Sequence, residues 1–176
     1  MARKAVVKMG NLKLATPSDA ILDIDKSYTE LLMLIQDMKD TMDEEGGIGI
    51  AAPQIGCNKR VIIFGFEDSP RYPQEKSIPF TVLINPSMKI LAPDIVDGWE
   101  GCLSVPGLRG LVPRYNHIEY KGYDLHGNTI TRIVDGFHAR VFQHEYDHLE
   151  GVLYPRRIKD LRFFGFEDEL MNNLEP

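Results

Sequence analysis

The sequence is poor in cysteine, in long apolar runs and in positive charge. Its 176 residues include only two cysteines, Cys57 and Cys102, so we expect a reducing compartment and no disulfide framework. No segment approaches the roughly 20 apolar residues that span a bilayer, and the first apolar run ends at Lys8, too early for a secretory signal. Twenty Lys and Arg against 26 Asp and Glu give a net charge of -6, which argues against direct binding to nucleic acid or to an anionic membrane. We therefore expect a cytoplasmic protein with a neutral or small substrate.

The remaining composition is that of an ordinary globular protein. With 43% hydrophobic and 26% charged residues, a chain of this length can bury a core without disulfide or metal staples. The sequence contains no internal repeat, no low-complexity stretch and no linker rich in Pro, Gly or Ser. We therefore expect a single domain over residues 1–176.

The spacing of apolar residues predicts two helices. In residues 25–45 apolar side chains recur at intervals of three and four, and Gly46-Gly47 ends the pattern. A second helix is predicted over residues 135–150. Four of its side chains fall on one face, at steps of four, three and four: Phe137, Val141, His144 and His148.

Five strand-like segments lie between these two helices. They are residues 60–66, 80–85, 88–92, 117–125 and 129–134, and the last two are joined by a hairpin turn at His126-Gly-Asn. Residues 1–24 are expected to lie extended on the surface, and the chain from residue 156 to form one short helix before an acidic tail. The order of elements favours an α+β fold over alternating βαβ units, with the second helix buried within the sheets.

The strongest chemical motif is His144-Glu145-Tyr-Asp-His148, an H-E-x-x-H sequence on the second predicted helix. Two imidazoles four residues apart project from one helical face and can share a metal ion, while the glutamate lies beside a bound water as a base. The alternative is a pair of ordinary helix histidines with an exposed glutamate between them. In that case the segment would have no metal.

Two histidines leave a catalytic metal one protein ligand short. The extended metalloprotease motif would place a third histidine at position 154, where this chain has Tyr154, and a later glutamate, Glu167 or Glu169, lies in the polar tail. Cys102 is the remaining candidate, in a loop-forming stretch over residues 99–107, and a thiolate there would favour a soft or borderline divalent ion. The alternative for a lone cysteine is a small apolar filler, which is how we interpret Cys57.

A third segment runs from Gly47 to Gly56 and reads GIGIAAPQIG. It lacks the Gly-Lys-Ser/Thr ending of a phosphate loop. Its small residues would let a peptide backbone run close alongside, and Gln54 supplies an amide donor for an oxyanion. Taken alone, the segment is equally consistent with a packed turn.

The three segments GIGIAAPQ, EGCLS and HEYDH resemble, in this order, the three signature motifs of the peptide deformylase family. The resemblance continues through Leu111-Val-Pro-Arg114 and residues 143–153, so it covers residues 46–154. The family removes the formyl group from the N-terminal methionine of newly made bacterial proteins, releasing formate. The resemblance implies mixed, mostly antiparallel sheets packed around a central helix that contains HEYDH. It also implies formylmethionyl N-termini of nascent polypeptides as the partner.

The resemblance also implies the metal site and the catalytic groups. The metal ligands would be Cys102, His144 and His148, with water in the remaining place. One divalent ion is expected, Fe2+ in the cell with Zn2+ or Ni2+ as substitutes, although the ligand set alone suggests zinc at least as readily. Glu145 would act as base and then as acid. The oxyanion would be met by the Gln54 side-chain amide and the Leu103 backbone N–H.

Substrate selection requires an apolar slot for methionine and backbone groups for the following residues. We predict that Ile48, Phe137 and Val141 line the slot. Backbone groups of Ile48, Gly49 and Gly101 are expected to pair with an extended peptide, as in strand addition. Arg109 is predicted to approach the peptide beyond the methionine, with a solvated loop charge as the alternative.

Three charged residues near the motifs are left without a settled role. Glu100 is expected to fasten the Cys102 loop through a buried hydrogen bond or ion pair, with Arg114 as the candidate partner. Asp147 is interpreted either as support for the metal ligands or as a helix-face charge.

The C-terminus departs from the basic helix with which many bacterial deformylases dock on the ribosome. The last twelve residues contain four acids and no Lys or Arg, which disfavours a contact with phosphate through the tail. The sequence therefore leaves undecided whether the protein docks on the ribosome. Action on nascent chains does not require such docking.

The main competing hypothesis is a zinc metallopeptidase of the H-E-x-x-H type. This hypothesis uses the same base and the same two histidine ligands, but it does not explain the EGCLS segment. A structural metal in a protein without enzymatic activity is the second alternative, although such sites more often have four protein ligands.

Overall fold

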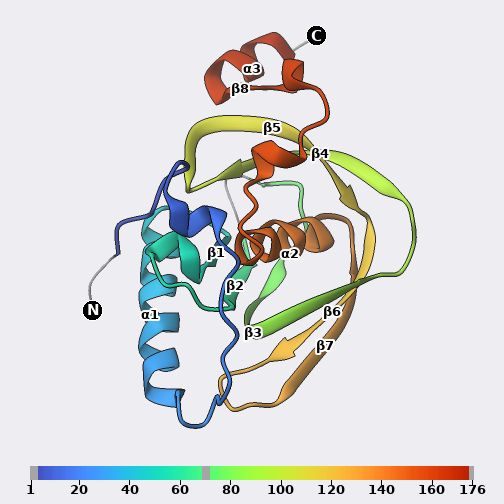
Figure 1. The fold of residues 1–176 in the computed structure, drawn as a ribbon. Helices are drawn as coiled ribbons and strands as arrows, with labels where there is room; N and C mark the ends of the chain where they lie inside the picture. Colours follow the sequence, from blue (N-terminus) through green and yellow to red (C-terminus); the bar gives the residue numbers. More distant parts are fainter. Residues whose placement is uncertain (1–3, 69–71, 175–176) are drawn as a thin grey trace.

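The computed structural model describes residues 4–68 and 72–174 (Figure 1). These residues form three α-helices: α1 (Tyr28–Glu44), α2 (Gly136–Leu149) and α3 (Glu167–Leu174). The strands are β1 (Gly49–Ala51), β2 (Val61–Phe66), β3 (Ile78–Ile90), β4 (Ile95–Cys102), β5 (Val105–Tyr115), β6 (His117–Tyr123), β7 (Thr129–Asp135) and β8 (Phe164–Phe166). Short 3-10 helices occupy Leu12–Ala15, Ala52–Ile55, Tyr154–Arg157 and Leu161–Phe163.

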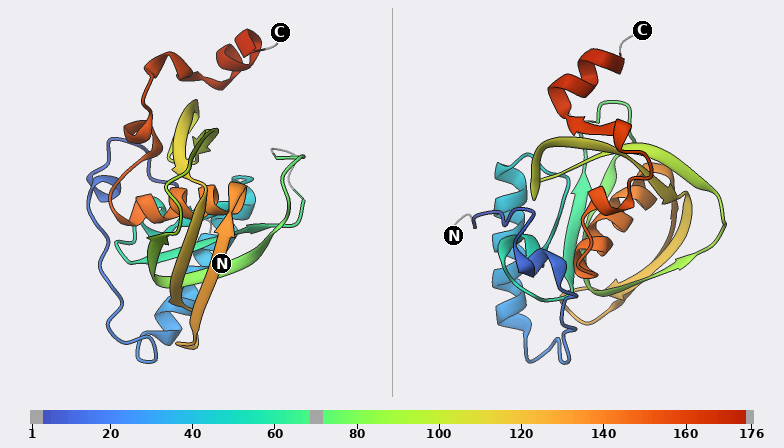
Figure 2. Two further views of the ribbon diagram at one scale, coloured as in Figure 1. Left: turned by 90° about the vertical axis from the view of Figure 1, so that its right-hand side faces the viewer. Right: turned by 45° about the horizontal axis from the view of Figure 1, so that its top comes forward.

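The strands form two antiparallel sheets with α2 between them. One sheet has the order β1-β2-β3-β6-β7 and the other the order β4-β5-β8. Helix α2 contacts strands of both sheets, and Figure 2 shows it enclosed between the larger sheet and the β4–β5 hairpin. The predicted α+β class is confirmed. Among the described helices, none combines the length and the apolar character that crossing a membrane requires.

Both faces of the larger sheet are buried at strand β2. Ile62 and Phe64 pack in a cluster with residues of α2, whereas Val61 and Ile63 pack with residues of α1. Successive side chains of a strand point to opposite faces. A strand covered by a helix on each side therefore needs an unbroken apolar run, and all four side chains have no exposed surface.

The two strands predicted over residues 80–85 and 88–92 are wrong as separate elements, because they form the single strand β3. Its pairing with β6 shifts register between Ile84 and Ser87, and Asn85 has a φ of 51°. Asparagine tolerates this left-handed conformation. The Asn-Pro pair that resembles a turn is therefore an irregularity inside one strand.

The loop predicted over residues 99–107 is also wrong, because this stretch is the turn and the adjoining strand ends of a β-hairpin. Strand β4 ends at Cys102, β5 begins at Val105, and Pro106-Gly107 lies inside β5. A Cβ at Gly98 would lie 2.6 Å from Cζ of Arg140. At least one glycine of the hairpin therefore serves close packing and not chain reversal.

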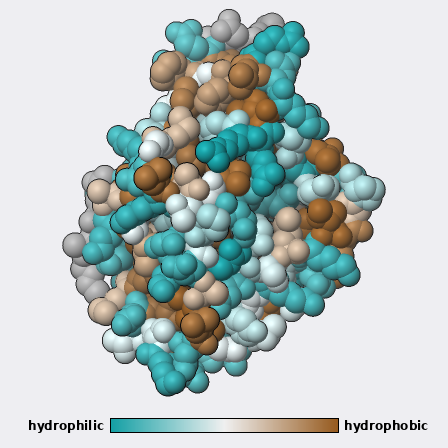
Figure 3. All heavy atoms as spheres, viewed as in Figure 1, coloured by the Kyte–Doolittle hydropathy of each residue, from teal (hydrophilic) through white to brown (hydrophobic). Residues whose placement is uncertain are grey.

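The tail also differs from the prediction of one short helix followed by an exposed acidic end. Strand β8 adds to β5, and α3 follows it. Leu161, Phe163 and Phe166 remain exposed, and apolar side chains gather over this end of the molecule at the top of Figure 3. The last two residues of the predicted acidic tail, 175–176, lie outside the described residues.

Gly151, directly after α2, offers a test of backbone packing. Its φ is 69°, and a Cβ there would lie 2.8 Å from the backbone carbon of Ala15, whereas Gly127, with a φ of 76°, has open space around it. We expect Gly127→Ala to lower the free energy of unfolding by about 1 kcal/mol through conformational strain alone. Gly151→Ala should lower it by about 3 kcal/mol, because a clash is added to the strain. Urea titration of both variants measures the difference, and equal losses would contradict the packing argument.

His138 on α2 should make stability depend on pH. Its Nε2 lies 3.1 Å from the buried hydroxyl of Tyr120, and burial, together with the charge of Arg132, lowers the pKa of His138 from 6.5 to about 4. The unfolded chain therefore binds an extra proton between these values, and stability falls as pH drops from 6.5 to 4. In urea titrations at pH 7 and pH 4.5, His138→Gln should lose less stability than the parent by roughly 1 kcal/mol, a value reduced for the half-buried position. An equal loss would show that His138 is not responsible.

Candidate active site

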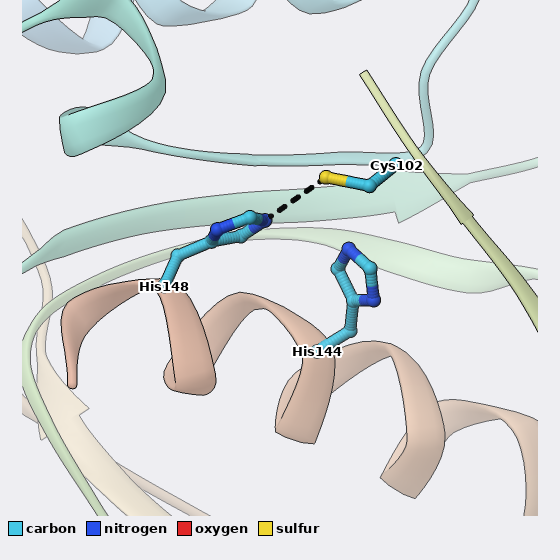
Figure 4. A group of neighbouring side chains, drawn as sticks. All are labelled: Cys102, His144 and His148. Carbon is cyan, nitrogen blue, oxygen red and sulfur yellow. Dashed lines mark hydrogen bonds between the residues drawn. The ribbon is translucent and has the colours of Figure 1, made fainter. Parts of the chain in front are cut away.

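Cys102, His144 and His148 converge at the centre of the molecule. His144 and His148 project from α2, and Cys102 comes from the end of β4 (Figure 4). One donor atom from each side chain lies within 4.8 Å of the others, and Cys102 Sγ is 3.3 Å from His148 Nε2. One sulfur and two imidazole nitrogens suit a borderline divalent ion such as zinc or ferrous iron. The group can therefore hold a metal ion with a place left for water.

Glu145 lies beside this group and has the properties expected of a proton acceptor. Its carboxylate is buried, and Oε2 has no hydrogen-bond partner in the described part of the chain. Burial raises the pKa of Glu145 to about 7, although the nearby charge of His144 opposes the shift. A Cβ at Gly49 would lie 2.4 Å from Glu145 Oε1. The absence of a side chain at Gly49 thus leaves space for the carboxylate, and Oε2 could accept a hydrogen bond from a water molecule that a metal ion at this group would bind.

Glu100 is the partner of His144 on the side away from the metal group. Its Oε2 lies 2.8 Å from His144 Nδ1, which leaves Nε2 for a ligand. The Arg114 guanidinium donates to both carboxylate oxygens at 2.9 Å, so the predicted pairing of Glu100 with Arg114 is present. Although burial raises the pKa of Glu100, Arg114 and His144 outweigh burial and hold it well below its usual range. The carboxylate is thus ionised and orients the histidine.

Asp147 and Arg140 extend this buried group of charges. Asp147 accepts from Arg114 Nη1 at 2.5 Å and from Arg157 Nη2 at 2.7 Å, so it supports the site through Arg114. Arg140 donates to Glu100 Oε1 at 2.9 Å and to the backbone carbonyls of β4 and β5. These contacts attach α2 to the hairpin that contributes Cys102.

Gln54 is buried within reach of the metal group. Its Oε1 accepts from the Ala51 backbone N–H at 2.8 Å, which fixes the orientation of the amide. Its Nε2 donates to Ser104 Oγ at 3.1 Å and lies 3.5 Å from Cys102 Sγ. The donor end of the amide therefore faces the sulfur ligand.

A pocket opens in front of these side chains and brings together most of the residues predicted for the site. Those in its lining are Ile48, Gly49, Gln54, Gly101, Cys102, Leu103, Phe137, Val141, His144 and Glu145. His148 is buried behind it. Arg109 is not in the lining, and forms an ion pair with Glu167.

The lining also includes Gly47 and Glu100, which belong to the motifs, and three residues to which the sequence analysis gives no role: Tyr72, Trp99 and Arg140. Trp99 is the only tryptophan of the chain and directly precedes Glu100, which is a signal that could have found it. Arg140 is a charge next to the apolar face of a buried helix, which is a second such signal. No sequence signal indicates Tyr72, because the segment between β2 and β3 that contains it shows no regular spacing of apolar residues.

Comparison with known proteins agrees with this geometry. The family model for polypeptide deformylase matches residues 3–163. Peptide deformylase 1 of Nitrosomonas europaea is 55% identical over 168 residues, covering 95% of this chain and 94% of the relative. Peptide deformylase 2 of Ralstonia nicotianae is 52% identical over 171 residues, covering 97% and 96%.

Solved structures show the same likeness. The Met-Ala-Ser-bound class I type b peptide deformylase of Acinetobacter baumannii has a TM-score of 0.85 at 37% identity, covering 89% of this chain and 99% of that one. The peptide deformylase of Thermotoga maritima has a TM-score of 0.78 at 29% identity, covering 91% and 100%. These matches confirm the resemblance of the three motifs, and the chain belongs to the polypeptide deformylase family of enzymes.

Proposed function

We propose that this protein is a metal-dependent hydrolase that removes the formyl group from the N-terminal formylmethionine of newly synthesised proteins and releases formate. The observation that carries the proposal is the convergence of Cys102, His144 and His148 beside the buried Glu145, at the base of a pocket. Membership of the family supports it. The proposal treats residues 1–176 as a single catalytic domain working in the cytoplasm. It does not require docking on the ribosome through the acidic tail.

The metal ligands in this proposal are Cys102, His144 and His148, and the ion is Fe2+ in the cell, with Zn2+ or Ni2+ as substitutes. When bound, a divalent ion supplies Lewis acidity that lowers the pKa of water toward neutrality. The sulfur ligand supports a deformylase over a zinc metallopeptidase, for which Cys102 would have no purpose. The comparisons do not favour the peptidase.

Glu145 is the proton carrier of the proposed reaction. It takes the proton of the attacking water and delivers it to the amine that leaves the formyl carbon, so one carboxylate acts as base and then as acid. A pKa of about 7 supports both roles, because the two protonation states are then close in free energy near neutral pH.

The formyl oxygen becomes anionic when water adds to the carbon and requires donors already in place. We assign this role to the Gln54 side-chain amide and the Leu103 backbone N–H. The hydrogen bond from Ala51 to Gln54 Oε1 supports the assignment, because it turns Nε2 toward Cys102.

The peptide is proposed to bind as an added strand between the two sheets. Strands β1 and β4 each end the order of their sheet, and Gly49 of β1 and Gly101 of β4 both line the pocket. Together with Ile48 their backbone groups would pair with the peptide. Phe137 and Val141 complete the apolar slot with Ile48. The bound Met-Ala-Ser of the Acinetobacter baumannii relative supports a peptide ligand of this kind.

The deciding experiment uses enzyme purified without oxygen and with its metal quantified. We expect about one divalent ion per chain and release of formate from a formyl-Met peptide, with no acetate from the acetyl counterpart. Cleavage of internal peptide bonds, or no turnover with metal bound, would contradict the proposal.

The Cys102→Ser variant tests the sulfur ligand. It should lose metal and activity together, whereas retained metal with unchanged hydrolysis would show that the thiolate is not a ligand.

Gln54→Ala tests the oxyanion assignment. We expect kcat to fall about 10²-fold, or ~3 kcal/mol, because one preorganised donor is lost, while the metal content stays near that of the parent. Ser104→Ala is the matched control, since it removes a partner of Gln54 Nε2 and keeps the amide. Loss of metal from Gln54→Ala, or an equal fall in kcat for Ser104→Ala, would show that Gln54 is structural.

A further inference from the structure

The C-terminal segment, residues 161–170, contacts one residue of the pocket lining, Trp99, and pairs with the neighbouring strand β5. The ring of Phe163 makes an edge-to-face contact with Trp99, with centroids 6.5 Å apart. Strand β8 pairs with β5 so that Gly165 lies opposite Arg109. Figure 1 shows β8 and α3 above the β4–β5 hairpin. Seven of its ten residues, 164–170, lie beyond the residues that the family model matches, which end at 163.

Arg109 is the residue through which the segment approaches the site. It lies opposite Gly101 in the β4–β5 pairing, and a Cβ at Gly101 would be 3.8 Å from Cγ of Arg109. The arginine side chain therefore covers the pocket strand directly before Cys102. Its Nε is 2.6 Å from Glu167 Oε1, and the two side chains are 14% and 43% exposed.

Glu167 also lines a second hollow, which we call the rim hollow. Its lining includes Gly46, Gly101, Cys102, Leu103 and Glu167. The stretch 101–103 lines the main pocket as well, so the two hollows adjoin along it. A peptide that leaves the main pocket on this side passes the carboxylate of Glu167.

We propose that Glu167 determines specificity by holding Arg109 and disfavouring peptides with acidic residues after the N-terminal methionine. This inference rests on the proposed function, because it takes the peptide path to start at the metal group. Glu167 acts in two ways. It occupies the guanidinium that would otherwise pair with a substrate carboxylate, and it repels that carboxylate directly.

The solvent exposure of the Arg109–Glu167 ion pair limits how strongly it discriminates against acidic peptides. Glu167 is partly solvated, so its interaction with Arg109 is modest and is screened by salt. Neutral residues in the substrate do not compete for Arg109. The discrimination therefore concerns acidic peptides and should weaken as ionic strength rises.

Trp99 allows peptide binding to be measured independently of catalysis, because the only tryptophan of the chain lines the pocket. The metal-loaded enzyme is titrated with the amidated peptides Met-Ala-Ser, Met-Glu-Ser and Met-Ala-Glu while Trp99 fluorescence is followed. Amidation removes the terminal carboxylate, which would itself compete for Arg109. Release of formate from formyl-Met-Ala-Ser is assayed in parallel.

The parent should bind the acidic peptides more weakly than Met-Ala-Ser. Glu167→Gln should reduce this ratio of dissociation constants about threefold to tenfold at low salt. Asp168→Asn, which removes the adjacent charge but keeps an acceptor for the Glu169 backbone N–H, should leave the ratio unchanged. In the background of Arg109→Gln, the effect of Glu167→Gln should shrink, because Glu167 acts largely through Arg109.

An unchanged ratio in Glu167→Gln, or an equal change in Asp168→Asn, would overturn the inference. If the parent binds the peptides but releases no formate, the proposed function fails while the ratio still decides the role of Glu167. If the parent binds none of the peptides, the inference is overturned as well.

Discussion

The buried carboxylate of Glu100 joins the β4–β5 hairpin to helix α2, and the metal group is assembled across that junction. Arg114, Arg140 and His144 all have nitrogens within 2.9 Å of its two oxygens, and only 5% of Glu100 is exposed. Removing one partner of such a buried group leaves an uncompensated charge, which typically costs about 3–5 kcal/mol. Cys102 on the hairpin and His144 on the helix thus keep their relative positions, because separating the buried charges between them has a large free-energy cost.

The same environment gives two neighbouring carboxylates opposite properties. Cations surround Glu100 and keep it ionised, whereas Glu145 lies against the backbone of Gly49, and burial raises its pKa to about 7. One carboxylate can therefore orient a ligand while the other exchanges a proton. This division of labour depends on which carboxylate the arginines reach, because their charges stabilise the ionised form only at close range.

The sequence predicts more of the site than of the sheets around it. The H-E-x-x-H spacing, the apolar face of its helix and the resemblance to three motifs together anticipated the side chains that meet at the pocket. The sequence predicts a loop over residues 99–107 of the β4–β5 hairpin, because glycine and proline there are typical of turns. At Gly98 the glycine instead makes room for Arg140, and that requirement depends on a side chain 42 residues away in the sequence.

The sequence by itself determined the family, the helix that bears both histidines and the type of ligand atoms, because these depend on local spacing and on the chemistry of single residues. Only the tertiary structure decided that Arg140 ties β4 to α2, that Arg109 pairs with Glu167 and that β8 completes the smaller sheet. These contacts join segments distant in sequence, and their free energy comes from burial and from charge pairing that no local pattern records.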